Sequence, residues 1–112
     1  MTERFGEAMR LMRCADPQKR EDGFSLLRSH VVEHVEELIA EFRAEPGDHG
    51  LSCWLLELIG EAKSPSALPL LSELVDDEDE SFRYWAVQGL TRLSSKEARQ
   101  VLWRARANRR ID

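Results

Sequence analysis

The sequence predicts an all-α protein built from repeated helical hairpins. Apolar residues recur at spacings of three and four along most of the chain, which is the pattern of a helix with one buried face. No segment alternates apolar and polar residues with the period of two that indicates a strand. With 112 residues, the chain is long enough for one domain with a single hydrophobic core.

Helix signals divide the first half of the chain into three segments. Residues 1–14 place their apolar side chains on one face. Asp16-Pro17 then combines a capping residue with a proline at the first helical position, and the helix that starts there is expected to reach about Ser29. A third helix is expected over 32–44, where a Pro-Gly turn ends it.

The second half contains four further predicted helices. The first covers about 50–62, and a Ser-Pro pair repeats the cap-and-proline signal before the next helix. The acidic run 76–80 is expected to be a turn whose carboxylates lie near the positive N-terminal end of the following helix. Ser94 and Glu97 match a capping box at the start of the last helix.

The helical segments also repeat one another. A shift of thirty-one residues brings Trp54 onto Trp85 and aligns the apolar positions and the serine caps that follow. A shift of thirty-two aligns 24–42 with 56–74. Because one hairpin cannot bury its own apolar face, the repeat predicts three helix pairs stacked on one another.

The repeat unit resembles that of a known family. The stretch LIGEAKSPSALPLLSELVDDED, residues 58–79, is similar to the unit of HEAT-repeat proteins, in particular the short HEAT-like repeats common in bacteria. The resemblance covers 51–105 and extends more weakly over 16–45. It implies a single HEAT-like domain over 1–112, folded as a right-handed α-α superhelix. The implied parts are an N-terminal capping helix, 1–14, and repeats over 16–45, 48–76 and 79–108.

Charge is distributed unevenly along the chain. Residues 1–30 carry six basic and five acidic side chains (+1), and residues 31–80 carry two basic and fourteen acidic (−12). Residues 81–112 carry eight basic and two acidic side chains (+6), which completes the net charge of −5. An acidic middle and a basic end affect the choice and steering of partners more than the fold.

One short motif has the form of a metal site. His30, Glu33 and His34 match H-x-x-E-H, in which two histidines on one helix bind zinc and the glutamate polarises water. The repeat places a turn near 31–33, however, so the motif does not lie on a continuous helix. Cys14 and Cys53 have no motif around them and are expected to be packed thiols. We therefore predict no metal ligand, no cofactor and no catalytic residue.

The basic end of the chain raises the question of nucleic-acid binding. Its arginines could contact phosphates, but the adjoining repeats are acidic and no basic face with interleaved aromatic residues spans the chain. A solvated helix end is favoured over a nucleic-acid site. The arginines concerned are Arg99, Arg104, Arg106, Arg109 and Arg110.

The second helices of stacked pairs usually form the concave binding surface in this architecture, and their outward positions supply the candidate site. Trp103 lies about 140° around the helix from Ala98, off the apolar stripe. Exposed tryptophan beside arginine is typical of an interface hot spot. The candidate protein-binding residues are Glu37, Glu41, Glu73, Trp103 and Arg104. An acidic ridge that would favour a basic partner is formed by Glu33, Glu36, Glu37, Glu41, Glu73 and Asp76.

The sequence thus favours a non-enzymatic scaffold that presents an acidic concave face to a basic protein. Two alternatives stay open: a toxin-neutralising immunity protein whose acidic face mimics nucleic acid, and an accessory or lyase-like role on a cofactor or chromophore, as in HEAT-like bilin-attachment proteins. No signal peptide or membrane-spanning segment is visible, so a cytoplasmic location is expected. The chain is expected to be a monomer or to associate weakly with itself, its basic end meeting its acidic middle.

Overall fold

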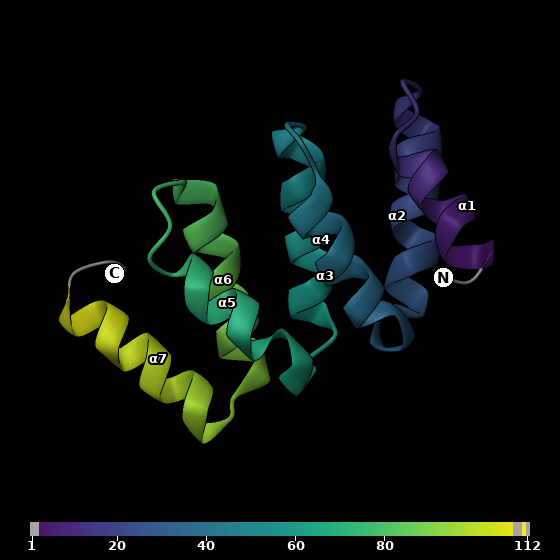
Figure 1. Cartoon of the computed structure of the whole chain (residues 1–112). Helices are drawn as coiled ribbons and strands as arrows, with labels where there is room; N and C mark the ends of the chain where they lie inside the picture. The colour runs from purple at the N-terminus through teal and green to yellow at the C-terminus, as the bar shows by residue number, and fades with distance from the viewer. Residues whose placement is uncertain (1–2, 109–110, 112) are drawn as a thin grey trace.

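The computed structural model describes residues 3–108 and 111, and all regular structure in that part of the chain is helical (Figure 1). The predicted all-α fold is therefore confirmed. The elements are α1 (Glu3–Met12), α2 (Pro17–Ser29), the 3-10 helix η1 (Val31–His34), α3 (Val35–Ala44), α4 (His49–Glu61), the 3-10 helix η2 (Pro65–Ala67), α5 (Leu68–Leu74), α6 (Glu80–Leu93) and α7 (Lys96–Ala107).

The helices form a stack of hairpins (Figure 1). Helix α1 packs on α2, α3 on α4 and α5 on α6, and the helices α2, α4 and α6 also contact one another in that order. On the other side of the stack, α3 contacts η2 and α5 contacts α7. The predicted hairpin stack is thus confirmed, whereas the right-handed superhelix, the capping role of 1–14 and the repeat bounds stay predictions.

Aspartates at matching positions begin the first helix of each predicted repeat. Asp16, Asp48 and Asp79 are the N-caps of α2, α4 and α6, and a carboxylate oxygen of each accepts a hydrogen bond from a backbone N–H in the first turn. Their spacing is 32 and then 31 residues, the same as the repeat in the apolar pattern. The repeat is therefore present in the hydrogen bonding as well as in the core.

Serines begin the second helical segment of the last two predicted repeats, and the residue before each serine has a left-handed backbone. Lys63, with φ of 51°, precedes the cap Ser64, and Ser94, with φ of 55°, precedes the cap Ser95. A left-handed residue lets the chain leave one helix and start the next within two residues.

The capping box predicted for Ser94 and Glu97 is wrong, because the cap of α7 is the next residue, Ser95. Ser94 is the C-cap of α6, and its hydroxyl donates to the carbonyl oxygen of Thr91 at 3.0 Å. The cap of α7 is Ser95, whose Oγ accepts the backbone N–H of Ala98 at 3.1 Å. Both serines fit the sequence rule for a cap, so only the backbone conformation distinguishes them.

Two predicted α-helices begin with a 3-10 turn. The segment predicted as a helix over 32–44 starts with η1, where Glu33 N–H donates to His30 O at 3.0 Å. The helix expected after Ser64 starts with η2, where Ala67 N–H donates to Ser64 O at 3.0 Å. These bonds to the third preceding residue tighten the chain where it reverses, and the spacing of apolar residues does not encode them.

Helix α4 lies at the centre of the core and approaches α6 through glycine. Leu55, Leu56 and Ile59 are completely buried. A Cβ atom on Gly60 would lie 3.1 Å from the Cα atom of Gly89, so the two helix backbones meet without side chains between them. This close approach sets where α6, and therefore α7, stands relative to the centre.

Helix α1 approaches α2 in the same way at Gly23. A Cβ atom there would lie 2.5 Å from the carbonyl oxygen of Ala8 and 2.9 Å from Cβ of Leu11. Phe5 of α1 is completely buried, and its ring centroid lies 5.4 Å from that of His34. Helix α1 is therefore part of the same core as the repeats.

Replacing Gly23 with alanine should destabilise the protein, because the added methyl group meets backbone that cannot rotate away. We expect Gly23→Ala to lower the free energy of unfolding by about 1–3 kcal/mol. The matched control is Gly47→Ala, where no atom lies within 4 Å of the added Cβ. Urea unfolding checks both variants, and equal midpoints for the two would contradict the close approach.

Replacing Lys63 with glycine should stabilise the protein. A left-handed conformation costs a non-glycine residue about 1–2 kcal/mol, and the greater freedom of glycine in the unfolded chain cancels part of that gain. We expect Lys63→Gly to raise the free energy of unfolding by about 0.5–1 kcal/mol. Lys63→Ala keeps the Cβ atom and should show no such gain in the same urea titration.

Candidate protein-binding surface

The five candidate residues come from the three helices on one side of the stack. Glu37 and Glu41 lie on α3, Glu73 on α5, and Trp103 and Arg104 on α7. The structure places them in different environments.

Glu37 is directed toward the core rather than into solvent. Its Oε1 lies 3.0 Å from Nδ1 of His34, which is itself only 5% exposed and stands beside the ring of Phe5. A carboxylate held in this way orients the histidine at the junction of η1 and α3. The negative charge of Glu37 is therefore less accessible to a partner than the sequence pattern indicates.

Glu41 is part of an ion-pair network that joins α3 to the end of α1. Arg13 donates to Oε2 of Glu41 at 3.1 Å and to Oε1 of Glu45 at 2.8 Å. The other oxygen of Glu45 accepts the backbone N–H groups of Gly47 at 2.9 Å and Asp48 at 2.7 Å. The sequence did not single out Arg13 or Glu45, because they lie 32 residues apart and no local motif links them.

These bonds hold the Glu45 carboxylate in its charged form. The backbone N–H groups of Asp48 and Gly47, together with the Arg13 guanidinium, lower the pKa of Glu45 from 4.5 to about 2. The network therefore secures the turn between α3 and α4 and neutralises part of the predicted acidic ridge.

The Glu45 network predicts acid sensitivity. A carboxyl group whose pKa is lower in the folded state stabilises that state above its ordinary pKa of 4.5, and the contribution is lost as the pH falls toward about 2. We expect Glu45→Gln to lower the midpoint of urea unfolding at neutral pH, and the difference from the wild type to shrink steadily below about pH 4.5. A difference of the same size at neutral pH and near pH 2 would contradict this account.

Glu73 remains in solvent but shares its charge with an arginine of the neighbouring helix. Arg43 on α3 donates to the two carboxylate oxygens of Glu73 at 3.3 and 3.5 Å. Both side chains are at least half exposed, so the pair contributes little to stability. Glu33 and Glu36 are the members of the ridge that lie exposed at the start of the α3 side.

Trp103 is the most exposed large apolar side chain in the described part of the chain, at 70%. It lines a shallow hollow of about 690 Å³ together with other residues of α7 alone. The lining residues, which we call the α7 stripe, are Lys96, Arg99, Gln100, Trp103 and Arg104. The exposure of Trp103 that the helical wheel predicts is confirmed. The charged side chains that line the hollow with it are basic.

Arg104 is the member of the α7 stripe that also lies beside the end of α5. It also lines a smaller hollow of about 260 Å³, to which α5 and the following turn contribute Ser72, Val75 and Asp76. The structure thus brings Arg104 next to the acidic part of the chain, but not into one patch with Glu37 and Glu41. Of the other predicted basic residues, Arg109 and Arg110 lie outside the described residues.

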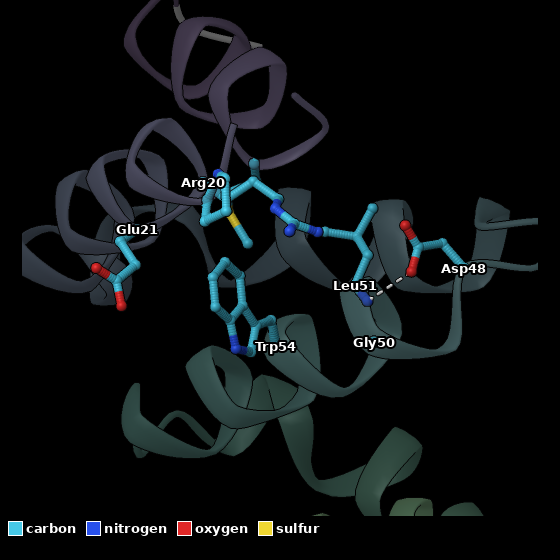
Figure 2. Close-up of a pocket in the computed structure, with 8 residues that line it drawn as sticks. Arg20, Glu21, Asp48, Gly50, Leu51 and Trp54 are labelled. Carbon is cyan, nitrogen blue, oxygen red and sulfur yellow. Dashed lines mark hydrogen bonds between the residues drawn. The ribbon is translucent and has the colours of Figure 1, made fainter. Parts of the chain in front are cut away.

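A further hollow, of about 320 Å³, lies between α2 and the start of α4 (Figure 2). Arg20 and Glu21 stand on its α2 side, and Trp54 and Asp48 belong to the α4 side. Asp48 is occupied there as the cap of α4, since its Oδ1 accepts the backbone N–H of Leu51 at 3.0 Å. The sequence did not single out this hollow, because its residues come from two different repeats.

The H-x-x-E-H motif does not form one helical face. His30 ends α2, Glu33 lies on η1, and His34 faces Glu37 and Phe5. The predicted turn within the motif is confirmed. Over residues 3–108 and 111, no group of three or more histidine, cysteine or acidic side chains is placed to hold a metal ion.

The two cysteines are free thiols, each half-buried. Burial, together with the nearby negative charge of Asp79, raises the pKa of Cys53. A raised pKa disfavours the thiolate, which is the reactive form in covalent attachment chemistry. The surroundings of Cys53 therefore do not activate its thiol.

Comparison with known proteins identifies the fold family. A family model described as HEAT repeats matches residues 35–111, which is more than half of the chain. No curated protein and no solved structure shows a significant match. Among the described residues, no helix is long and apolar enough to cross a membrane.

Proposed function

Because the chain belongs to the HEAT-repeat family, whose members generally mediate protein–protein interaction or scaffolding, we propose that it is a non-enzymatic protein-binding module. Its contact surface is the side of the stack formed by α3, α5 and α7. This is the side on which the second helices of the repeats stand, and the stack holds them in a fixed order.

The exposure of Trp103 carries the proposal. A tryptophan that is 70% exposed leaves a large apolar surface in water, and burial of that surface against a partner is favourable. Tryptophan and arginine are both enriched among the residues that dominate binding energy, and Arg104 adjoins Trp103. Inside its own helix Trp103 has no place in the core, which uses Ala98, Leu102 and Ala105.

The acidic part of this surface favours a basic protein partner. Glu33 and Glu36 are exposed, and residues 31–80 carry a net charge of −12. Arg13 and Arg43 neutralise part of that charge at Glu41 and Glu73, so the attraction rests on the other exposed members of the ridge, Glu33, Glu36 and Asp76. Electrostatic complementarity of this kind speeds association and weakens in salt.

Affinity capture from an extract of the native cell tests the surface. We expect Trp103→Ala to reduce capture of the specific partner by at least about tenfold, because the apolar anchor is lost. The matched control is Tyr84→Ala on α6, which removes an exposed aromatic side chain, 55% accessible, from the other side of the stack.

The charge variant Glu33→Lys with Glu36→Lys should weaken the same capture if the partner is basic. Retention of every partner by Trp103→Ala would show that the proposed surface is wrong. Unchanged capture by the charge variant, with loss in Trp103→Ala, would retain the surface and exclude the basic partner.

A further inference from the structure

We propose that the α7 stripe is a docking site for an acidic protein segment that carries an apolar side chain. The inference rests on the proposed function, because it names the partner chemistry for the part of the surface that contains Trp103. The surface would then bind groups of opposite charge at two places, because the exposed glutamates of η1 and α3 attract basic groups and the α7 stripe attracts acidic ones.

The spacing of the lining residues makes the stripe a continuous surface. Lys96, Arg99, Gln100, Trp103 and Arg104 follow one another at intervals of three, one, three and one, so they lie on one face of α7. From Lys96 to Arg104 the helix rises about 12 Å. The stripe therefore matches about two turns of a partner helix or a short extended segment.

The charge of the hollow is of one sign. Its lining includes the cationic groups of Lys96, Arg99 and Arg104 and no carboxylate. Glu97 lies on α7 but does not line the hollow. Arg99 also donates to the carbonyl oxygen of Ser94 at 2.5 Å, which holds its side chain near the start of the helix. Carboxylates are the complementary groups, and arginine can bind them through two parallel hydrogen bonds.

Trp103 adds an apolar requirement to this charge. It lines the same hollow as the cationic groups, and 70% of its surface is exposed. A partner that supplies carboxylates alone would leave the ring in water. A segment with an aliphatic or aromatic residue among its acidic residues would satisfy both parts of the stripe.

The surroundings favour a protein segment over a nucleic acid. The stripe contains one aromatic side chain, whereas sequence-tolerant binding of single strands uses a series of stacking rings along a basic groove. Arg104 adjoins Asp76 on its other side, and the acidic run 76–80 follows. A long polyphosphate leaving the stripe would meet these carboxylates, while a short acidic segment would not.

The charges at the two ends of the stack also argue against end-to-end stacking of copies. At the other end, a hollow on α1 is lined by Arg4, Gly6, Glu7 and Arg10, which has more positive than negative groups. Bringing this end against the α7 stripe would place like charges together. End-to-end stacking is therefore disfavoured, and the occupant that we propose is an acidic segment of another protein.

Titration followed by ¹⁵N NMR tests the inference. The probe is a synthetic helical peptide of about 14 residues, or four turns, that carries glutamates on one face with leucine between them. We expect it to shift the backbone resonances of residues 96–104 and the indole N–H of Trp103. A peptide with glutamine in place of each glutamate is the matched probe and should bind at least about tenfold more weakly.

Variants of the intact protein locate the site. We expect Trp103→Ala and Arg104→Glu each to weaken binding of the acidic peptide by at least about tenfold. Tyr84→Ala and Lys19→Glu make equivalent changes at exposed positions on α6 and α2 and should leave binding unchanged. Thermal unfolding of each variant shows whether it is folded.

Several outcomes would overturn the inference. Equal binding of the glutamine peptide would show that the stripe does not recognise negative charge. Binding that is insensitive to both α7 variants would show that the peptide binds elsewhere. Tighter binding of an oligothymidine than of the acidic peptide would assign the stripe to nucleic acid. Concentration-dependent shifts of Trp103 without peptide would assign it to a second copy. If the acidic peptide does not bind while capture of the native partner still requires Trp103, the proposed function is retained and this inference is wrong.

Discussion

The structure depends on the close approach of α4 and α6 at Gly60 and Gly89. Helix α4 supplies three completely buried leucines, and α6 can contact it closely only because neither glycine has a side chain at the crossing. A Cβ atom on Gly89 would also lie 2.8 Å from Leu71, so the same small residue lets α5 fold back onto α6. Because α7 follows α6 after a two-residue turn, the α4–α6 crossing also determines where α7 and Trp103 lie.

Ion pairs between repeats alter the electrostatic character that the sequence indicates. The acidic middle of the chain appears in the sequence as one block, but Arg13 and Arg43 reach Glu41 and Glu73 from other helices. The basic end receives less compensation, since the hollow around Trp103 is lined by cationic groups without a carboxylate. On the α3, α5 and α7 side, the most exposed large apolar group therefore lines a hollow together with cationic side chains of α7. This distribution is the basis for assigning the two parts of the surface to partners of opposite charge.

Particular residues show why the fold was predictable and some details were not. The caps Asp16 and Ser95 and the apolar stripes act within one or two helical turns, so their signals are local in the sequence. Ser94 was misassigned because two adjacent serines satisfy the same local rule, and the left-handed turn that separates them depends on how α7 leaves α6. The 3-10 geometry of η1 and η2 was not predicted for a similar reason, since it arises where the chain reverses between packed helices.

The sequence by itself determined the helices, their repeat and the exposure of Trp103, because each follows from side-chain periodicity along a single helix. Only the tertiary structure decided which charges face solvent. Glu37 turns toward His34, and Glu45 is bound by Arg13 from a helix 32 residues earlier in the chain. Contacts between segments so far apart depend on how the helices pack, and spacing along the chain carries no information about them. The candidate surface was therefore predictable as a set of residues, whereas its division into a partly neutralised acidic part and an open basic part was not.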